Sequence, residues 1–163
     1  MFSLIMLAIS LEMSLEPWQA INDGVMGGIS TGRMIETTHG LSFQGVVSLE
    51  NNGGFASVRR TIELDLSRTS KLRVRLQGDG RTYQARFRQD SSFDSIAWRA
   101  EFDTTGDWQT VELDFTDFAP VFRGRKVPQA GPLVAGKIRQ FGFLIGDKKA
   151  GPFKLEIKAI EFL

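Results

Sequence analysis

Hydrophobic and polar residues alternate with a period of two along most of this chain. In residues 71–77, leucine or valine occupies every second position, and lysine, arginine or glutamine occupies the positions between. Such alternation is typical of a β-strand with one buried and one solvated face, whereas a helix repeats every three or four residues. The same pattern recurs in residues 41–50, 83–88, 96–102, 111–115, 141–145 and 153–157.

Short turn motifs separate these segments. Glycine and aspartate lie together at residues 78–80, 105–107 and 146–148, and a glycine-proline pair lies at 151–152. These residue types favour turns, and no long helical stripe, repeat or linker interrupts the pattern. We therefore predict an all-β fold, a two-sheet sandwich or jelly roll, as one domain over residues 1–163. The side chains predicted to face its core are Leu72, Val74, Leu76, Phe87, Phe102, Val111, Leu113, Phe143, Leu155 and Ile157.

The residue composition excludes several kinds of site. The chain has no cysteine, so it can form neither a disulfide nor a thiolate metal site, and packing alone must hold the fold. Its one histidine, His39, precedes Gly40 in a predicted turn and is expected to be solvated. We therefore expect no metal and no cofactor. The absence of cysteine is compatible with a reducing cytoplasm, which is the expected location, with peripheral contact to a membrane left open.

The first eleven residues are strongly apolar, but the first basic residue is Arg33 and Glu12 and Glu16 follow the run. A secretory signal begins with basic residues, and this run is too short to span a bilayer. We expect an opening strand or terminal segment packed on the core, and a protein that is not integral to a membrane. A processed segment is the alternative.

Charges are unevenly distributed although the net charge is only +1. Residues 59–99 contain ten basic and five acidic residues, whereas residues 100–119 contain six acidic residues and no basic one. Either this segregation forms a patterned surface for a partner, or oppositely charged strands pair within a sheet. Nucleic acid is not an expected partner, because the net charge is near zero and most aromatic residues of the basic segment should be buried.

Six blocks of sequence carry a resemblance to a known family. The blocks are WQAINDGVMGGIS at residues 18–30, LENNGGFASVR at 49–59, GDGRTY at 78–83, WQTV at 108–111, FRGR at 122–125 and GPFKLEI at 151–157. In this order they resemble the complex I intermediate-associated protein family. The resemblance implies a galactose-binding-domain-like jelly-roll β-sandwich and a non-enzymatic role as an assembly factor or protein-interaction module.

The family resemblance also suggests partners. Its eukaryotic members help assemble respiratory complex I in mitochondria, so the implied partner is a protein, such as a subunit of a membrane respiratory or similar complex. This chain lacks an arginine-rich, acid-poor transit segment, so we expect a free-standing bacterial member. The alternative is a carbohydrate-binding module, with Trp98 and Trp108 as candidate sugar platforms, although the position of Trp98 in its strand predicts burial.

The polar residues of these blocks have two interpretations. They can line one face as a ligand or partner surface, or they can form a buried hydrogen-bond network that fixes loops. Trp18 and Met26 are expected to anchor the core beside the turn at 22–24, and glycine pairs at 27–28 and 53–54 suit positive φ or close backbone approach. The candidate site residues are Asp23, Ser30, Arg59, Asp79, Tyr83, Arg86 and Arg123.

Residues 28–32 match the Gly-x-Ser-x-Gly pattern of serine hydrolases, but a strand pattern follows where that motif requires a helix. We interpret the match as coincidental. Asp23, Asp79 and Asp94 could form an acid and base pair, yet nothing in the sequence brings any two together, and Asp79 lies between two glycines as a turn residue.

We accordingly predict that Ser30 is not a nucleophile. Incubation of the folded protein with a serine-reactive phosphonate, followed by mass spectrometry of the peptide that contains Ser30, should show no adduct. A phosphonate adduct on Ser30 would restore the hydrolase interpretation.

Overall fold

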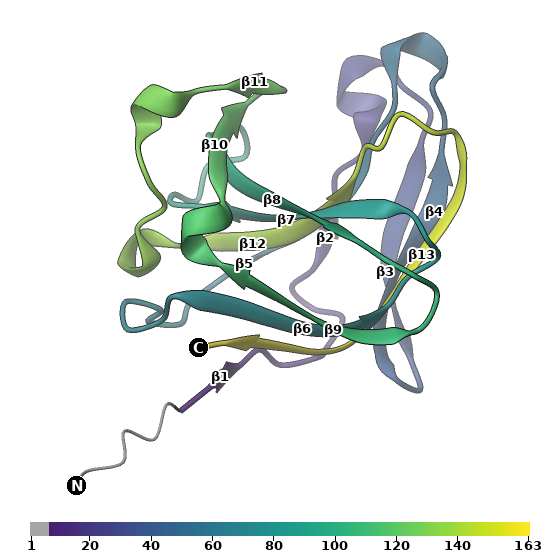
Figure 1. Ribbon diagram of the computed structural model, residues 1–163. Coiled ribbons are helices and arrows are strands. Elements are labelled where there is room, and N and C mark those ends of the chain that lie inside the picture. The colour runs from purple at the N-terminus through teal and green to yellow at the C-terminus, as the bar shows by residue number, and fades with distance from the viewer. Residues whose placement is uncertain (1–6) are drawn as a thin grey trace, which may run out of the picture.

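The computed structural model describes residues 7–163, which form two antiparallel β-sheets (Figure 1). Both sheets contain neighbouring strands that are far apart in sequence. In one sheet the thirteenth strand lies between the fourth and the sixth, and in the other the twelfth lies between the fifth and the seventh. In sheet order, sheet A contains β3 (Thr31–Thr37), β4 (Gly40–Val47), β13 (Gly151–Phe162), β6 (Lys71–Gln77) and β9 (Trp108–Asp114), and β1 (Ile9–Ser10) also pairs with β13. Sheet B contains β11 (Arg125–Lys126), β10 (Ala119–Phe122), β8 (Ala97–Asp103), β7 (Thr82–Arg88), β12 (Gln140–Ile145), β5 (Ala56–Thr61) and β2 (Gln19–Ala20).

Residues 7–163 contain no α-helix, so the predicted all-β sandwich is confirmed. Short turns of 3₁₀ helix connect some of the strands. They are η1 (Asp23–Met26), η2 (Glu50–Asn52), η3 (Phe115–Asp117), η4 (Pro128–Ala130) and η5 (Ala135–Lys137). In the part of the chain that the structure describes, no helix has the length and apolar character needed to cross a bilayer.

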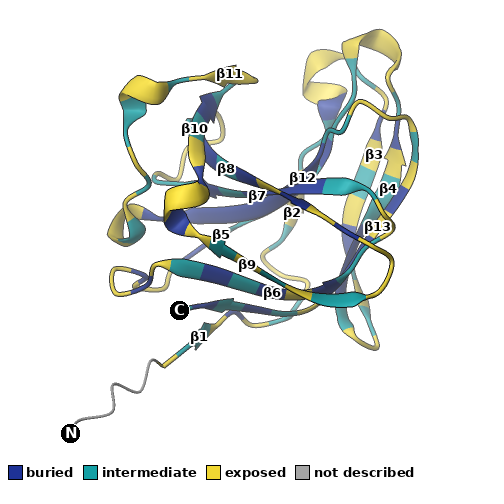
Figure 2. Cartoon of the chain, in the orientation of Figure 1, coloured by how far each residue is buried: buried dark blue, intermediate teal, exposed yellow. Residues whose placement is uncertain are grey.

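Aromatic side chains fill the space between the two sheets. Tyr83 and Phe87 of sheet B are fully buried, and Tyr83 packs edge-on against Phe43 and Phe153 of sheet A. Phe87 likewise contacts Phe162 at the end of β13. Figure 2 shows that buried positions concentrate along the strands, whereas the turns are mainly exposed. Because the protein has no cysteine, this packing holds the sheets together without covalent links.

Eight of the ten side chains predicted to face the core are buried. The other two, Val111 and Leu113, pack against the core but are only half-buried. Both lie on β9, which forms one edge of sheet A and has no neighbouring strand on its outer side.

Some expectations at loops and termini need correction. Gly151 and Pro152 begin β13 instead of forming a turn. Met26 is 61% exposed and is not a core anchor, because η1 directs Asp23 inward and leaves the end of the turn facing outward. Trp18 is half-buried and stacks on Phe143, as expected. The apolar N-terminal segment contributes β1 and a buried Leu11, while residues 1–6 lie outside the described part of the chain.

Sheet A explains part of the uneven charge distribution. The outward residues of β6 include Lys71, Arg73 and Arg75, and those of its neighbours β9 and β13 include acids. Lys71 Nζ lies 3.3 Å from Glu112 Oε2, and Arg73 Nη2 lies 3.2 Å from Glu161 Oε2. On this sheet, charges of opposite sign therefore pair across adjacent strands, which is one of the two explanations the sequence left open.

We expect Val74→Asp to unfold the protein. Val74 is 2% exposed between the sheets, where a carboxylate would have no partner. A buried unpaired charge costs roughly 3 to 5 kcal/mol, which is most of the stability of a typical domain. The matched control is Arg75→Asp, because Arg75 is the next residue and points outward from the same strand. Thermal melting followed by circular dichroism should show a cooperative transition for the control, and a similar transition for Val74→Asp would contradict the prediction.

Candidate functional site

Four arginines gather on the outer face of sheet B. Strand register places Arg59 opposite Gly142, Gly142 opposite Arg86, and Arg86 opposite Arg99. Adjacent strands lie about 4.8 Å apart, so the row from Arg59 to Arg99 spans roughly 14 Å. Arg88 lies two residues beyond Arg86 on the same face of β7. We call Arg59, Arg86, Arg88 and Arg99 the arginine face.

The packing of the core explains why the side chains of the arginine face point outward. Tyr83, Ala85 and Phe87 are all fully buried, so the alternate positions of β7 must face away from the core. Arg86 and Arg88 occupy two of those positions. In β12, a Cβ at Gly142 would lie 2.3 Å from the carbonyl oxygen of Val58 and 2.8 Å from Arg59 Cβ, so glycine is needed for close approach.

The arginine face brings like charges together. Arg86 and Arg99 are direct cross-strand neighbours, an arrangement that is unfavourable for two cations. Burial and the positive charges of nearby arginines lower the pKa of Arg86 to about 10. Burial and Arg59 likewise lower the pKa of Arg88 to about 10, although nearby aspartates oppose the shift. Both side chains remain charged at neutral pH.

The hydrogen-bonding capacity of these arginines is only partly used. Among residues 7–163, the Nε atoms of Arg86 and Arg88 are shielded from solvent and have no hydrogen-bond partner. Arg99 has one acidic neighbour, with its Nη1 4.0 Å from Glu101 Oε1. Buried polar groups are usually satisfied, so these two Nε atoms are exceptions within the packing of the described residues.

The loop between β7 and β8 folds back toward this face. Arg59 Nη2 donates a hydrogen bond to the carbonyl oxygen of Phe93 at 2.6 Å, and the Arg59 guanidinium lies 4.8 Å from the centre of the Phe93 ring. Gln140 Nε2 donates to the carbonyl oxygens of Asp90 and Ser92. Phe93 nevertheless remains 61% exposed, so the loop presents an aromatic ring beside the arginines.

Arg123 lies at the rim of the arginine face. It follows β10, has a φ of 49°, and places Nη2 2.5 Å from Asp94 Oδ2 in the loop between β7 and β8. Both side chains of this ion pair are substantially exposed, so its contribution to stability is small. Figure 1 shows β10 and β11 at one end of sheet B, where this contact forms.

Asp23 and Ser30 form a separate network at the loops. Asp23 is fully buried, and its carboxylate accepts hydrogen bonds from Ser30 N at 2.9 Å, Ser30 Oγ at 2.5 Å and Gly54 N at 2.8 Å. A Cβ on Gly28 or Gly53 would lie within 2.5 Å of this carboxylate. The glycines therefore give the buried anion space, as expected of close backbone approach. Burial alone would raise the pKa of Asp23, but these hydrogen bonds outweigh it and lower the pKa.

Asp79 and Tyr83 form a third group, beside the turn between β6 and β7. Tyr83 Oη donates to Asp79 Oδ2 at 3.0 Å, and the backbone N–H of Lys154 donates to the same oxygen at 2.8 Å. Burial, together with Asp79, raises the pKa of Tyr83. The other oxygen of Asp79 accepts a bond from the backbone N–H of Arg81, which is the geometry of a turn residue.

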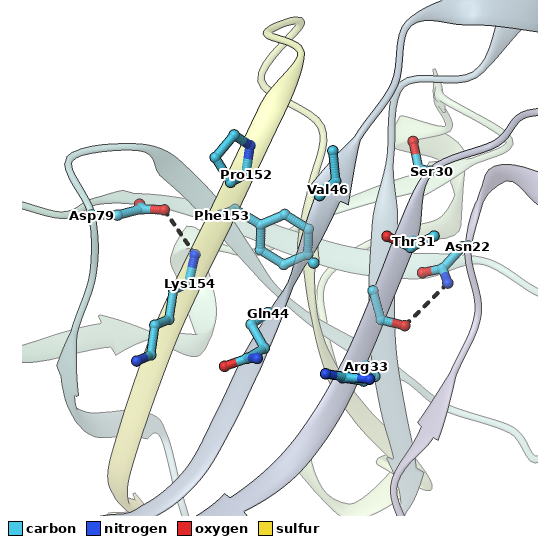
Figure 3. A pocket seen from close by; sticks show the side chains of 12 residues that line it. Asn22, Ser30, Thr31, Arg33, Gln44, Val46, Asp79, Pro152, Phe153 and Lys154 are labelled. Carbon is cyan, nitrogen blue, oxygen red and sulfur yellow. Dashed lines mark hydrogen bonds between the residues drawn. The ribbon is translucent and has the colours of Figure 1, made fainter.

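A shallow groove of about 870 Å³ lies on the outer face of sheet A, away from the arginine face (Figure 3). Figure 3 shows Arg33, Gln44 and Lys154 side by side on β3, β4 and β13. Several polar groups around the groove already serve the fold, since Asn22 Nδ2 donates to the carbonyl oxygen of Gly32 and Asp79 accepts from Lys154 N. The groove therefore offers fewer free recognition groups than the arginine face.

The seven candidate residues thus separate into three places. Arg59, Arg86 and Arg123 converge on the outer face of sheet B, whereas Asp79 and Tyr83 lie at the turn before β7 and Asp23 with Ser30 at the loops. Asp79 therefore does not share one face with the arginines, and its hydrogen bonds are those of the network interpretation. Sequence reasoning missed Arg88 and Arg99, although the alternation of apolar positions in their strands placed both outward.

We expect Asp23→Asn to destabilise the protein by about 1 to 3 kcal/mol, because an amide cannot accept every bond that the buried carboxylate accepts. A lowered pKa in the folded state means that the ionised carboxylate contributes stability above its ordinary pKa, and this contribution is lost as the pH falls through the folded value. Urea unfolding between pH 7 and pH 2 should therefore show a shallower acid dependence for Asp23→Asn than for the wild type. Asp107→Asn, at an exposed position, is the control, and equal slopes for all three proteins would contradict the role of Asp23.

Two curated relatives align with part of this chain. The mitochondrial complex I intermediate-associated protein 30 of Mus musculus is 37% identical over 106 residues, which are 62% of this chain and 32% of the relative. The Drosophila melanogaster protein of the same name is 29% identical over 109 residues, which are 62% of this chain and 36% of the relative. The aligned part of this chain thus spans about a third of the length of each of these relatives.

Solved structures with a similar fold include carbohydrate-binding modules. A family 11 module from Clostridium thermocellum, in complex with a mixed-linked tetrasaccharide, superposes with a TM-score of 0.71 at 15% identity and covers 96% of this chain and 95% of the module. A family 30 module has a TM-score of 0.62 at 13% identity, with coverage of 97% and 88%. At such low identity the likeness concerns the fold, which is the galactose-binding-like jelly roll.

The family comparison covers nearly the whole described chain. The family described as complex I intermediate-associated protein 30 matches residues 8–157, which include all the strands except the last part of β13. The six sequence blocks lie within this range, and they supply the loop network of Asp23 as well as Arg59 and Arg123. The chain therefore belongs to the complex I intermediate-associated protein 30 family.

Proposed function

We propose that this protein is a non-enzymatic assembly factor that binds a protein subunit of a larger complex through the arginine face. The observation that carries the proposal is the direct juxtaposition of Arg86 and Arg99 on an outward face, to which Arg59 and the exposed Phe93 also belong. Arginine and aromatic side chains are enriched at protein interfaces, where a few of them contribute most of the affinity. Membership of the family supports the assembly role.

The chemistry of the other candidate residues supports a role without catalysis. Ser30 is 7% exposed, and its hydroxyl is bonded to a carboxylate that also holds two backbone N–H groups. The Asp79 carboxylate is likewise occupied by Tyr83 and by the backbone of β13. Side chains that fix loops in this way are not free to act as nucleophile or base, which favours a structural role for both groups.

The proposed partners are subunits of a respiratory or similar membrane complex, encountered from the cytoplasmic side without integration into the membrane. Carbohydrate is the less favoured ligand, since Trp98 is buried and its Nε1 donates to the carbonyl oxygen of Gly131. Trp108 lies on the outer face of sheet A beside His39, whereas the arginine row lies on sheet B.

The assembly role can be tested by affinity purification of the tagged protein from its native host, with and without mild detergent. Recovery of the same membrane-complex subunit in repeated preparations is the expected result. Recovery of a glycan, or of no reproducible partner, would contradict the proposal.

We further expect Arg86→Gln and Arg99→Gln to weaken partner capture without lowering the melting temperature. Each change removes one of two opposed cations, which should leave stability unchanged or raise it by up to about 1 kcal/mol. Asp79→Ala should behave in the opposite way, because it leaves Tyr83 Oη and Lys154 N without their acceptor and costs about 1 to 3 kcal/mol.

Melting and capture should be measured on the same preparations, with Arg75→Gln on sheet A as the charge-matched control. Arg75 is exposed and makes one side-chain bond, to Thr110. A lower melting temperature for both arginine-face variants with full capture would assign Arg86 and Arg99 to the scaffold and refute the proposed surface.

A further inference from the structure

The spacing of the arginine face suits several separate anionic groups. Arg86 and Arg88 are two residues apart on one strand, so their attachment points lie about 6.6 to 6.8 Å apart along β7. Arg99 extends the array to the neighbouring strand, whereas Arg59 is buried and its guanidinium is held by Phe93. One small oxyanion cannot contact all of these positions together, whereas a ligand with anionic groups at regular intervals can.

An extended peptide has the matching repeat. Alternate side chains of an extended chain point to the same side and are also about 6.6 to 6.8 Å apart. Carboxylates at every second residue would therefore coincide with Arg86 and Arg88 if such a segment followed the direction of β7. Arg99, on the neighbouring strand, lies beside this line and can contact the same carboxylates from the side.

The type of cation is also informative. The four cations of this face are arginines, and a guanidinium offers two parallel N–H groups that fit a carboxylate as a bidentate pair. The Nε atoms of Arg86 and Arg88 are shielded from solvent, so an incoming carboxylate would pair with the two terminal Nη groups of each guanidinium. Among the described residues no acidic side chain forms a hydrogen bond with Arg86 or Arg88, since Asp94 pairs with Arg123 and Glu101 lies near Arg99. Asp90 and Asp94 offset part of the charge of Arg88 through space.

The surroundings favour a polypeptide over a phosphate-bearing ligand. Phe93 is 61% exposed at one border of the arginine face, and the half-buried Phe122 lies under the Arg123 guanidinium, 5.2 Å from it. Apolar side chains of a peptide can cover these rings, whereas a phosphate group cannot. A segment whose surface-facing side chains include both acidic residues and, farther along, an apolar residue would therefore use both features of this surface.

We infer that the arginine face binds an extended acidic segment of the partner protein, with carboxylates at alternate residues paired to Arg86 and Arg88 and an apolar side chain against Phe93. This inference rests on the proposed function, because it specifies the chemistry of the partner at the same surface. Binding replaces unpaired cations by charge-assisted hydrogen bonds and removes the repulsion between Arg86 and Arg99.

The inference can be tested with a capped peptide of alternating glutamate and valine as probe, titrated into the full chain by isothermal calorimetry. Its control is the same peptide with glutamine in place of glutamate. The wild type and Arg75→Gln should bind the glutamate probe equally, and the glutamine peptide should not bind. Arg86→Gln and Arg88→Gln should each weaken binding by about tenfold or more, because each loses a charge-assisted pair. Their unchanged melting temperatures would exclude misfolding as the cause.

Two further ligands distinguish other sources of negative charge. Inorganic phosphate and phosphatidylcholine vesicles containing phosphatidylglycerol should bind more weakly than the glutamate probe. Tighter binding of either one, with dependence on Arg86, would overturn the acidic-segment inference in favour of phosphate chemistry. Equal binding of the glutamate probe to the wild type, Arg86→Gln and Arg88→Gln would also overturn it.

Competition separates this inference from the proposed function. The glutamate probe should release the partner captured from the host. Arg86-dependent capture that the probe does not disturb would preserve the assembly role and refute the acidic segment. Arg86-dependent binding of the probe by a protein that captures no host subunit would preserve the acidic specificity and refute the assembly role.

Discussion

Aromatic packing between the two sheets is the constraint on which the remaining structure depends. Tyr83 and Phe87 fit against rings from sheet A, and a shift of one residue in β7 would exchange the buried and outward positions of the strand. The same packing that buries the phenylalanines therefore requires Arg86 and Arg88 to face outward. In a chain without cysteine, the core determines both the stability of the sandwich and the chemistry of its outer face.

The carboxylate of Asp23 has a comparable role for the loops. It joins the segment before β3 to the segment before β5 through Ser30 and Gly54, which are 24 residues apart in sequence. The glycines at 28 and 53 leave space around the anion, and this explains why two glycine-rich blocks that are distant in sequence both occur. Residues that resembled a catalytic motif thus stabilise the end of the sandwich, whereas the candidate recognition surface lies on strands.

The sequence predicted those elements whose apolar positions alternate without interruption. Residues 71–77 coincide with β6, but β5 was not recognised because Arg59 and Arg60 are adjacent and break the alternation. Alternation also predicted the outward direction of Arg86. It could not predict that Arg59 lies two strands from Arg86. The strand between them, β12, begins more than eighty residues after Arg59 in the sequence. Asp79 was misassigned for a similar reason, since its partner in β13 is 75 residues away.

The uneven charge distribution along the sequence has a different result on each sheet: opposite charges pair on sheet A, whereas like charges meet on sheet B. On sheet A, Lys71 and Arg73 of β6 pair with Glu112 and Glu161 across the strand boundaries, so these charges neutralise one another within the fold. On sheet B, Arg86 faces Arg99, and the acidic residues near them are too few or already paired. Stability alone would favour the first arrangement on both sheets, because like charges in direct cross-strand contact are unfavourable. Folding stability alone therefore does not explain the arginine face, and this is the physical reason for the proposal that a partner binds there.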